Sequence, residues 1–170
     1  MKHPVYLTTS DKRTFQVDKV YDCLLDVQRK NLLFSHSFSG CDTVSAIFGA
    51  GKVMFFKKIC SDNAEEIGLQ DEIDISYSPV SSKDEITSAG IKIFQYLYNS
   101  KTADKTLPQL RYTSFTKMAA KAVIRPERLP PTEGAVTQHS LRAYLLLTAS
   151  RLAKLEKYVI GSNQFRLVKK

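Results

Sequence analysis

The sequence contains few of the residues that form disulfide bonds or bind transition metals. Its three cysteines, Cys23, Cys41 and Cys60, are odd in number and lack the C-x-x-C spacing of zinc sites. This pattern argues against a disulfide framework and a structural zinc ion, so we expect buried free thiols. The three histidines are scattered along the chain, which makes core or surface positions a better expectation than a histidine-based metal cage.

Long apolar segments are also absent. No apolar run approaches the ~18 residues that a bilayer helix needs, so we expect a protein that does not enter the membrane. The first four residues lack the apolar stretch of a secretory signal, which predicts an intracellular protein, with the nucleus as one candidate compartment. The composition, with 43% hydrophobic and 25% charged residues, is typical of an ordinary globular chain.

Positive charge is in clear excess. The formal net charge is +8 and the sequence pI is about 9.4, which favours a polyanionic partner such as nucleic acid, with DNA as the expected ligand. Basic residues dominate Lys52 to Lys58, Lys117 to Arg128 and Arg142 to Lys170, whereas acidic residues gather between Asp62 and Asp74. A solvated helix surface is the alternative explanation for about half of these basic residues.

The first third of the chain predicts a hairpin followed by helices. Val5 to Thr9 and Thr14 to Val17 are short β-prone runs around a polar turn. Asp18 is placed to cap a first helix, and Leu32 begins a second one that leads to Ser39 and Gly40. A sheet that begins this way has an unpaired edge, so we expect the later part of a larger α/β domain.

Residues 61–82 are acidic and polar, and they predict a connection with one short helix. We place the main boundary there, which gives residues 1–61 as one domain and residues 62–170 as a helical extension. Ser82 and Glu85 form a capping box, and the apolar residues that follow have helical spacing: Ile86, Ala89, Ile93, Phe94 and Leu97.

The last third predicts two more helices. Residues 107–121 form the first, whose Tyr112 and Phe115 we expect to pack rather than to stack on bases. Thr132 caps the second and longer helix, whose residues 143–147 are apolar all round and are therefore expected to be buried or to face a partner. Residues 158–168 predict a terminal hairpin.

One segment carries most of the functional signal. Gly49 and Gly51 flank Ala50, and such a G-x-G turn exposes backbone N–H groups without a Cβ in the way. The turn precedes a predicted basic helix, Lys52 to Ile59, whose N-terminus favours an anion; Lys52, Lys57 and Lys58 add charge. Most such turns only close a loop, which remains the alternative interpretation.

Asp42 precedes this turn. Its carboxylate is a candidate ligand for a divalent cation that also touches a bound backbone. The simpler alternative is an N-cap on a predicted helix over Thr43 to Phe48, where its oxygens would accept unpaired N–H groups.

Residues 40–59 resemble the helix-three-turn-helix element of the flap-endonuclease branch of PIN-like 5′-nucleases. The shared order is G-x-D, four residues, Ile, one residue and G-x-G, followed by a basic helix. The resemblance implies that Asp42 is a catalytic residue that binds Mg²⁺ or Mn²⁺. It also implies that Gly49, Ala50 and Gly51 hold a duplex backbone around a monovalent cation such as K⁺. The lysines of the following helix, Lys52, Lys57 and Lys58, would then contact the backbone.

A wider likeness covers residues 36–45, 49–52, 129–132 and 139–144. These resemble a group of mobile-element-associated invertebrate proteins that carry a PIN-like nuclease region. The resemblance implies an α/β, mostly helical fold, namely a truncated PIN-like domain with an N-terminal β-hairpin, a helix-three-turn-helix element and a C-terminal helical extension. Members of that group carry an acidic strand before the matched region, and this sequence begins after that point.

Three functions follow as hypotheses. The first is nucleic-acid backbone binding by a catalytically deficient, nuclease-derived fragment, because two-metal hydrolysis needs several convergent carboxylates and Asp42 is one. The second is an active divalent-metal-dependent nuclease, which requires further carboxylates near Asp42; Asp18, Asp22 and Asp26 are the candidates. The third is a protein-interaction module that binds no nucleic acid.

Overall fold

Local sequence signals set where most elements of this chain begin and end, and the result is mostly helical. The computed structural model describes residues 4–98, 105–122 and 124–167, with side chains described up to residue 153 in the last helix. None of the described helices is long and apolar enough to cross a bilayer.

The chain opens with the predicted hairpin. Strands β1 (Tyr6–Thr8) and β2 (Thr14–Gln16) pair antiparallel, with Leu7 opposite Phe15. Helix α1 (Val17–Asp22) follows directly. Asp18 does not cap it, because residue 16 is the N-cap and the Asp18 carboxylate instead accepts the N–H of Val5 at 3.3 Å.

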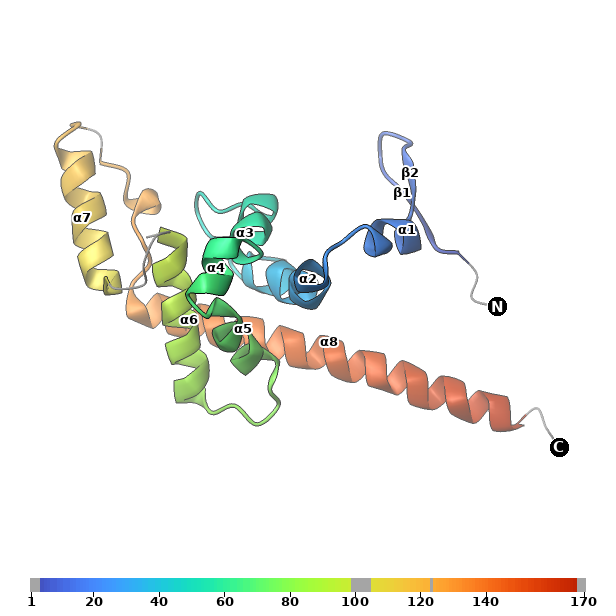
Figure 1. Cartoon of the computed structure of the whole chain (residues 1–170). Helices are drawn as coiled ribbons and strands as arrows, with labels where there is room; N and C mark the ends of the chain where they lie inside the picture. The colour runs from blue at the N-terminus through green and yellow to red at the C-terminus, as the bar shows by residue number, and fades with distance from the viewer. Residues whose placement is uncertain (1–3, 99–104, 123, 168–170) are drawn as a thin grey trace.

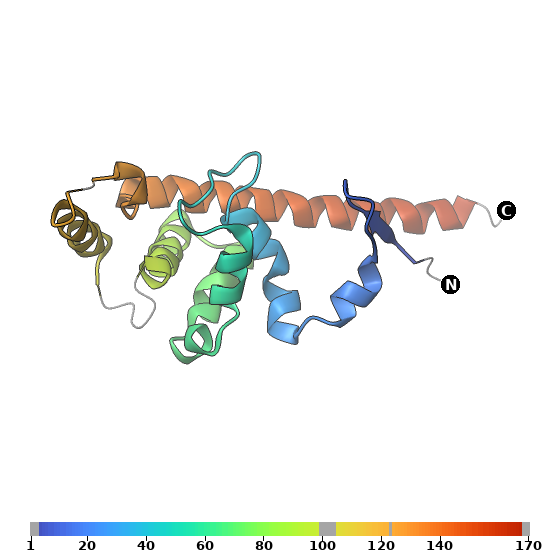
Figure 2. The same ribbon diagram turned by 90° about the horizontal axis from the view of Figure 1, so that it is seen from above.

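This N-terminal unit lies apart from the helical body (Figures 1 and 2). No residue of α1 is buried. The unit also exposes a set of large apolar side chains: Val5, Tyr6, Leu7, Phe15, Val17, Val20 and Tyr21. The hairpin therefore rests mainly on its own hydrogen bonds, and a two-stranded ribbon of this kind is marginally stable alone.

The helical body consists of α2 (Asp26–Phe38), α3 (Lys52–Ile59), α4 (Asp62–Glu66), α5 (Leu69–Tyr77), α6 (Lys83–Tyr98), α7 (Leu107–Ala119) and α8 (Glu133–Leu167). A 3₁₀ turn, Pro126–Arg128, precedes α8. The second helix begins at residue 26, six residues before the predicted start. Helix α3 and the capping box at the start of α6 are confirmed; in the box, the Ser82 N–H donates to Glu85 at 2.7 Å and the Glu85 N–H donates to the Ser82 hydroxyl at 3.2 Å.

Phenylalanine rings from successive helices form the centre of the core. The ring centroid of Phe38 lies 4.9 Å from that of Phe34, 5.8 Å from that of Phe55 and 5.5 Å from that of Phe94. These side chains belong to one buried cluster that also includes residues of α5 and α8, such as Ile73. Residues on both sides of the boundary predicted at residues 61 and 62, such as Ile59 and Ala64, belong to this cluster.

Residues 61–82 contribute to the core rather than forming a connection with one short helix. They form both α4 and α5, and the α5 residues Leu69, Ile73 and Ser76 are buried. Their spacing of four and then three residues is that of one helix face. The acidic composition that suggested a linker comes largely from the remaining faces.

Helices α6 and α8 cross very closely. A Cβ added at Gly90 would lie 1.8 Å from the Ser140 hydroxyl oxygen, so a larger residue does not fit there without movement. Figures 1 and 2 both show α8 running past α6, α5 and α2 and then extending beyond the body. The glycine therefore sets how near the two main helices approach.

Helix α8 begins as predicted, with the Ala135 N–H donating to Thr132 Oγ1 at 3.3 Å. The apolar stretch 143–147 is buried on one face only, because Leu147 is fully buried whereas Leu145 is 65% exposed. The backbone stays helical through residue 167, so the predicted terminal hairpin is wrong over 158–167; residue 168 lies outside the described residues. Strand propensity is a weak and context-dependent preference, and continuation of an existing helix overrides it here.

Candidate nucleic-acid interface

The loop between α2 and α3 is fixed at its first residue. Gly40 has φ +109°, and a Cβ there would lie 2.5 Å from the Ala46 Cα, so both the conformation and the space require glycine. Cys41 and Val44 then form an isolated antiparallel bridge, with N–H···O distances of 2.8 and 3.2 Å. Residues 41–44 are therefore a tight turn.

The helix predicted over Thr43 to Phe48 is wrong. This stretch is irregular, yet Val44, Ile47 and Ala50 are all buried. The irregular loop presents every third side chain to the core. Helical hydrogen bonds are not needed for that pattern.

Asp42 lies at the exposed tip of the tight turn, with no helix for it to cap. Among the described residues its carboxylate has no hydrogen-bond or ion-pair partner. The described part of the chain also contains no group of three or more His, Cys, Asp or Glu residues that would hold a metal ion. One carboxylate does not make up the donor set of a two-metal site, so the donors present do not fit the Mg²⁺ or Mn²⁺ that the resemblance implies.

The three thiols are free but not buried. Cys23 is exposed, and Cys41 and Cys60 are partly buried. The turn around Asp42 therefore has a half-accessible thiol at its base. The Thr43 hydroxyl, as hydrogen-bond partner, lowers the pKa of Cys41 below its ordinary value.

The glycine turn leaves open space. Gly49 has φ +73°, and no atom lies within 4 Å of where a Cβ would be at Gly49 or at Gly51. Ala50 differs from its neighbours, since its side chain is buried and its N–H donates to the Ile47 carbonyl at 3.1 Å. The glycines are therefore accessible to a ligand, whereas the Ala50 amide is already engaged within the turn.

Helix α3 begins without a side-chain cap. Gly51 is the N-cap, and the first turn contains no acidic residue. The Phe55 N–H donates to the Gly51 carbonyl at 2.9 Å, which leaves the N–H groups of residues 52–54 without an intrahelical acceptor. Uncapped N–H groups together with the positive end of the helix dipole favour an anion.

The three predicted lysines have different roles. Lys52 ties the loop together, because its Nζ donates to the Gly40 carbonyl at 2.6 Å and lies 3.4 Å from His36 Nδ1. Lys58 points to α6, where it donates to the Leu97 carbonyl and lies 5.5 Å from the ring centroid of Tyr96; burial lowers its pKa. Lys57 is exposed, with no ion pair to a described residue. The structure thus ties Lys52 to the first residue of the loop and Lys58 to α6, and neither lysine lines the hollow at the glycine turn.

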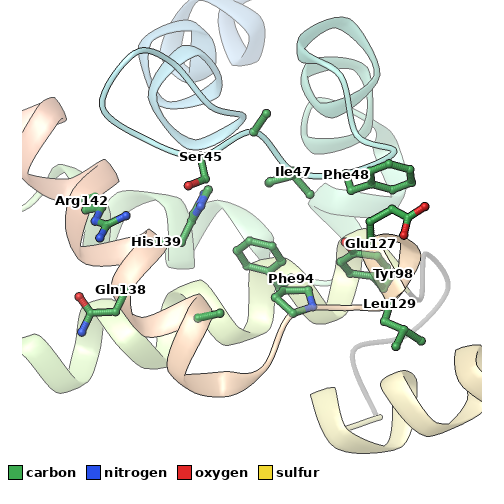
Figure 3. A pocket seen from close by; sticks show the side chains of 13 residues that line it. Ser45, Ile47, Phe48, Phe94, Tyr98, Glu127, Leu129, Gln138, His139 and Arg142 are labelled. Carbon is green, nitrogen blue, oxygen red and sulfur yellow. The ribbon is translucent and has the colours of Figure 1, made fainter. Parts of the chain in front are cut away.

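Three hollows, of about 330, 530 and 470 Å³, share lining residues, and residues of this loop line the first two. The first two share Phe48 and Tyr98, and the first and third share Leu129. Figure 3 shows Phe48, Tyr98 and Leu129 in succession on one side, with His139 and Arg142 on the other. We call these three hollows together the loop groove.

Arginines from distant parts of the sequence line the loop groove. Arg128 lines the same hollow as Gly49, Arg142 lines the hollow that contains Ser45, and Arg111 lines the third. Glu127 is the acidic residue among the lining residues. Sequence reasoning did not select these arginines; the basic composition of residues 117–128 was the signal that pointed to this region.

His139 forms a wall of the groove and is held by the core. Its ring lies edge-on to Phe38 and Phe94, at centroid distances of 4.8 and 5.2 Å. Its Nε2 lies 2.8 Å from the Phe38 carbonyl, to which it donates. Burial lowers the pKa of His139, and the charge of Arg142 lowers it further, so the imidazole is neutral near pH 7. This agrees with the expectation of a core histidine.

A comparison of the chain with protein-family models, with curated proteins and with solved structures finds no match. The resemblance to PIN-like nucleases therefore stays a prediction from the residue pattern. What the site can bind has to be argued from its own geometry.

Proposed function

We propose that this chain binds the phosphate backbone of a polynucleotide, with DNA as the expected ligand, at the glycine turn and the N-terminus of α3. The observation that carries the proposal is the hollow lined by both Gly49 and Arg128. Open backbone at the turn, Met54 in the first turn of uncapped α3 and the exposed Arg128 line this hollow together, although Arg128 is distant in the sequence from the other two.

Each part supplies a different component of phosphate binding. Gly51 and residues 52–54 offer N–H groups, which bind phosphate oxygens at close range. Arg128 offers a planar fork of donors that matches phosphate geometry, and exposed Lys57 adds longer-range attraction. Lys52 acts indirectly, because its bond to the Gly40 carbonyl holds the loop in the shape that exposes the glycines.

The PIN-like identity and the catalytic deficiency belong to the same proposal. Asp42 is the residue that the resemblance assigns to a catalytic metal, and the described residues contain no group of three or more His, Cys, Asp or Glu residues that could hold a metal ion with it. We therefore propose a nuclease-derived module that keeps backbone binding, and we derive no hydrolytic step. A K⁺ ion at the glycine turn would need carbonyl ligands, and those of Gly40 and Ile47 already accept hydrogen bonds.

Fluorescence anisotropy with a labelled blunt DNA duplex, at two salt concentrations, tests the proposal. We expect affinity to fall steeply with salt because bound cations displace counterions. Lys57→Glu and Arg128→Glu are each expected to weaken binding about tenfold and to reduce the salt slope by about one. Duplex binding that is absent, or that does not respond to salt, would contradict the proposal.

Lys83→Glu is the matched control. Lys83 is exposed in the first turn of α6, whereas Tyr98, which lines the groove, ends that helix. The two residues are separated by the length of a 16-residue helix, about 24 Å. The control carries the same charge reversal and is expected to bind like the unmodified protein.

The other two hypotheses give different results. An active nuclease would cleave DNA in the presence of Mg²⁺, and Asp42→Ala would abolish that cleavage. Residues 143–147 offer a protein partner less apolar surface than the sequence suggested, because Ala143 and Leu147 are buried in the chain's own core. Partners captured by the protein that survive nuclease treatment would favour that hypothesis.

A further inference from the structure

Helix α7 exposes aromatic side chains that were expected to pack. Tyr112 is 70% exposed and Phe115 is 43% exposed, so that expectation is wrong. The helix is held instead by buried Leu107 and Leu110, and by Arg111, which donates to the Pro130 carbonyl at 2.6 Å. The aromatic face is therefore left available at one end of the molecule (Figure 1).

Both aromatic side chains lie on the side of α7 that lines the loop groove. Tyr112 and Phe115 are three residues apart, a spacing that puts them on the same helix face, and both line the third hollow with Leu129. Leu129 also lines the hollow that contains Phe48, whose side chain is 50% exposed. Figure 3 shows Leu129 between Tyr98 and the yellow helix α7. Shared lining residues thus connect the hollow at the glycine turn, through the hollow at Phe48, with the hollow at the aromatic face.

Positive charge dominates the segment that contains α7 and the 3₁₀ turn. Residues 105–132 contain a single acidic residue, Glu127, and the basic residues Lys105, Arg111, Lys117, Lys121, Arg125 and Arg128. All of these basic residues except partly buried Arg111 are exposed. None of them forms an ion pair with a described carboxylate. Aromatic rings interleaved with unpaired cations suit a ligand that alternates flat bases and phosphates.

We propose that the loop groove and the exposed face of α7 bind a single-stranded segment of the polynucleotide, whose bases stack on Phe48, Tyr112 and Phe115. This inference rests on the proposed function, because the strand leaves the backbone site at the glycine turn and follows the groove. Arg111 and Arg128 lie along the path and contact its phosphates. Every base offers a flat face, so the binding depends little on sequence.

Two labelled ligands separate this inference from backbone binding: a blunt duplex, and the same duplex with a single-stranded tail. Tyr112→Ala and Phe115→Ala are each expected to weaken binding to the tailed duplex about tenfold and to leave blunt-duplex binding unchanged, since stacking contributes roughly 1–3 kcal/mol per base. Tyr112→Phe keeps the ring and is expected to retain affinity. Tyr6→Ala removes an exposed aromatic from β1 and serves as the control.

The chain has no tryptophan, so Tyr112→Trp introduces a unique fluorescent reporter. We expect this variant to bind the tailed duplex normally and its emission to be quenched by the tail but not by the blunt duplex. Tails of DNA and of RNA, compared in parallel, show which strand chemistry is preferred. Quenching by either tail supports the inference.

The possible failures are distinguishable. If the alanine variants change tailed-duplex affinity less than twofold, or weaken blunt-duplex binding equally, the single-strand inference is overturned. In both cases backbone binding survives if Lys57→Glu and Arg128→Glu still weaken the blunt complex. If the unmodified protein binds neither ligand, both proposals fail, and the aromatic face is left to a protein partner.

Discussion

The crossing of α6 and α8 and the surface of the loop groove use the same kind of residue for opposite purposes. At the crossing, Gly90 has no space for a methyl group because the Ser140 side chain occupies it. At the groove, Gly49 and Gly51 have nothing within 4 Å. One glycine permits two helices to pack, whereas the other two leave backbone exposed.

The difference teaches where stability and binding reside. The crossing and the phenylalanine cluster beside it are buried, so changes there should alter folding. The groove exposes rings and cations that make few internal contacts, so changes there should alter binding and leave folding nearly unchanged. Each variant below tests whether the two regions are as independent as this comparison implies.

Phe38→Ala should have the largest effect on stability. Phe38 is fully buried and its ring contacts Phe34, Phe55 and Phe94, so its removal leaves a cavity in the centre of the core. We expect a loss of about 3–5 kcal/mol in the free energy of unfolding, measured by urea denaturation. Phe115→Ala on α7 is the control and should cost about 1 kcal/mol or less. Equal losses would show that α7 belongs to the core.

Gly90→Ala should destabilise by about 1–3 kcal/mol, because the new methyl group meets the Ser140 side chain. Ser140→Gly removes the clashing atoms, so combining the two changes should recover part of the loss; the double-mutant cycle measures that coupling. Gly134→Ala, in the open first turn of α8, should instead stabilise slightly. A cycle without coupling would mean that the helices move apart rather than clash.

Local signals in the sequence predicted local structure well. The capping box at Ser82 and Glu85 and the β-prone runs of the hairpin each depend on residues a few positions apart, and both are confirmed. The start of α3 after Gly51 is confirmed for the same reason. The helix predicted over Thr43 to Phe48 is wrong, since Val44 and Ile47 are buried by an irregular loop instead.

Long-range features could not be predicted in this way. The spacing of Leu69, Ile73 and Ser76 was visible in the sequence, but the acidic residues between them suggested a linker. Nothing local indicates that Arg128 and Gly49 line one hollow, since tertiary packing of α6 and α8 brings them together. The sequence thus predicted the glycine turn but not the arginine side of the candidate site.

His139 packs against the core and also lines the groove, and it should make the stability of the protein depend on pH. Burial lowers its pKa below the ordinary value of about 6.5, with Arg142 adding to the effect. Below pH 6.5, about the ordinary pKa, the imidazole takes up a proton in the unfolded chain but not yet in the folded chain, which favours unfolding. The stability that the neutral, buried His139 contributes is therefore complete above that pH and is lost as pH falls toward the pKa of the folded state. Urea denaturation at pH 5.5 and 7.5 should show the loss for the unmodified protein and a smaller one for His139→Gln. An identical pH dependence in both proteins would contradict this assignment.

Asp42→Ala should have the smallest effect on stability, within about 0.5 kcal/mol, because the exposed carboxylate has no partner among the described residues. A loss near 1 kcal/mol in urea denaturation would instead indicate a capping role. The same variant tests whether the charge of this exposed turn acts on a bound backbone. With EDTA present, removing a negative charge beside a bound backbone should tighten duplex binding, by no more than about fivefold, since a close charge pair in water contributes ~1 kcal/mol. If the variant instead binds more weakly when Mg²⁺ is supplied and unchanged when it is withheld, Asp42 holds a cation against the backbone, and the turn at residues 41–44 retains part of a metal site.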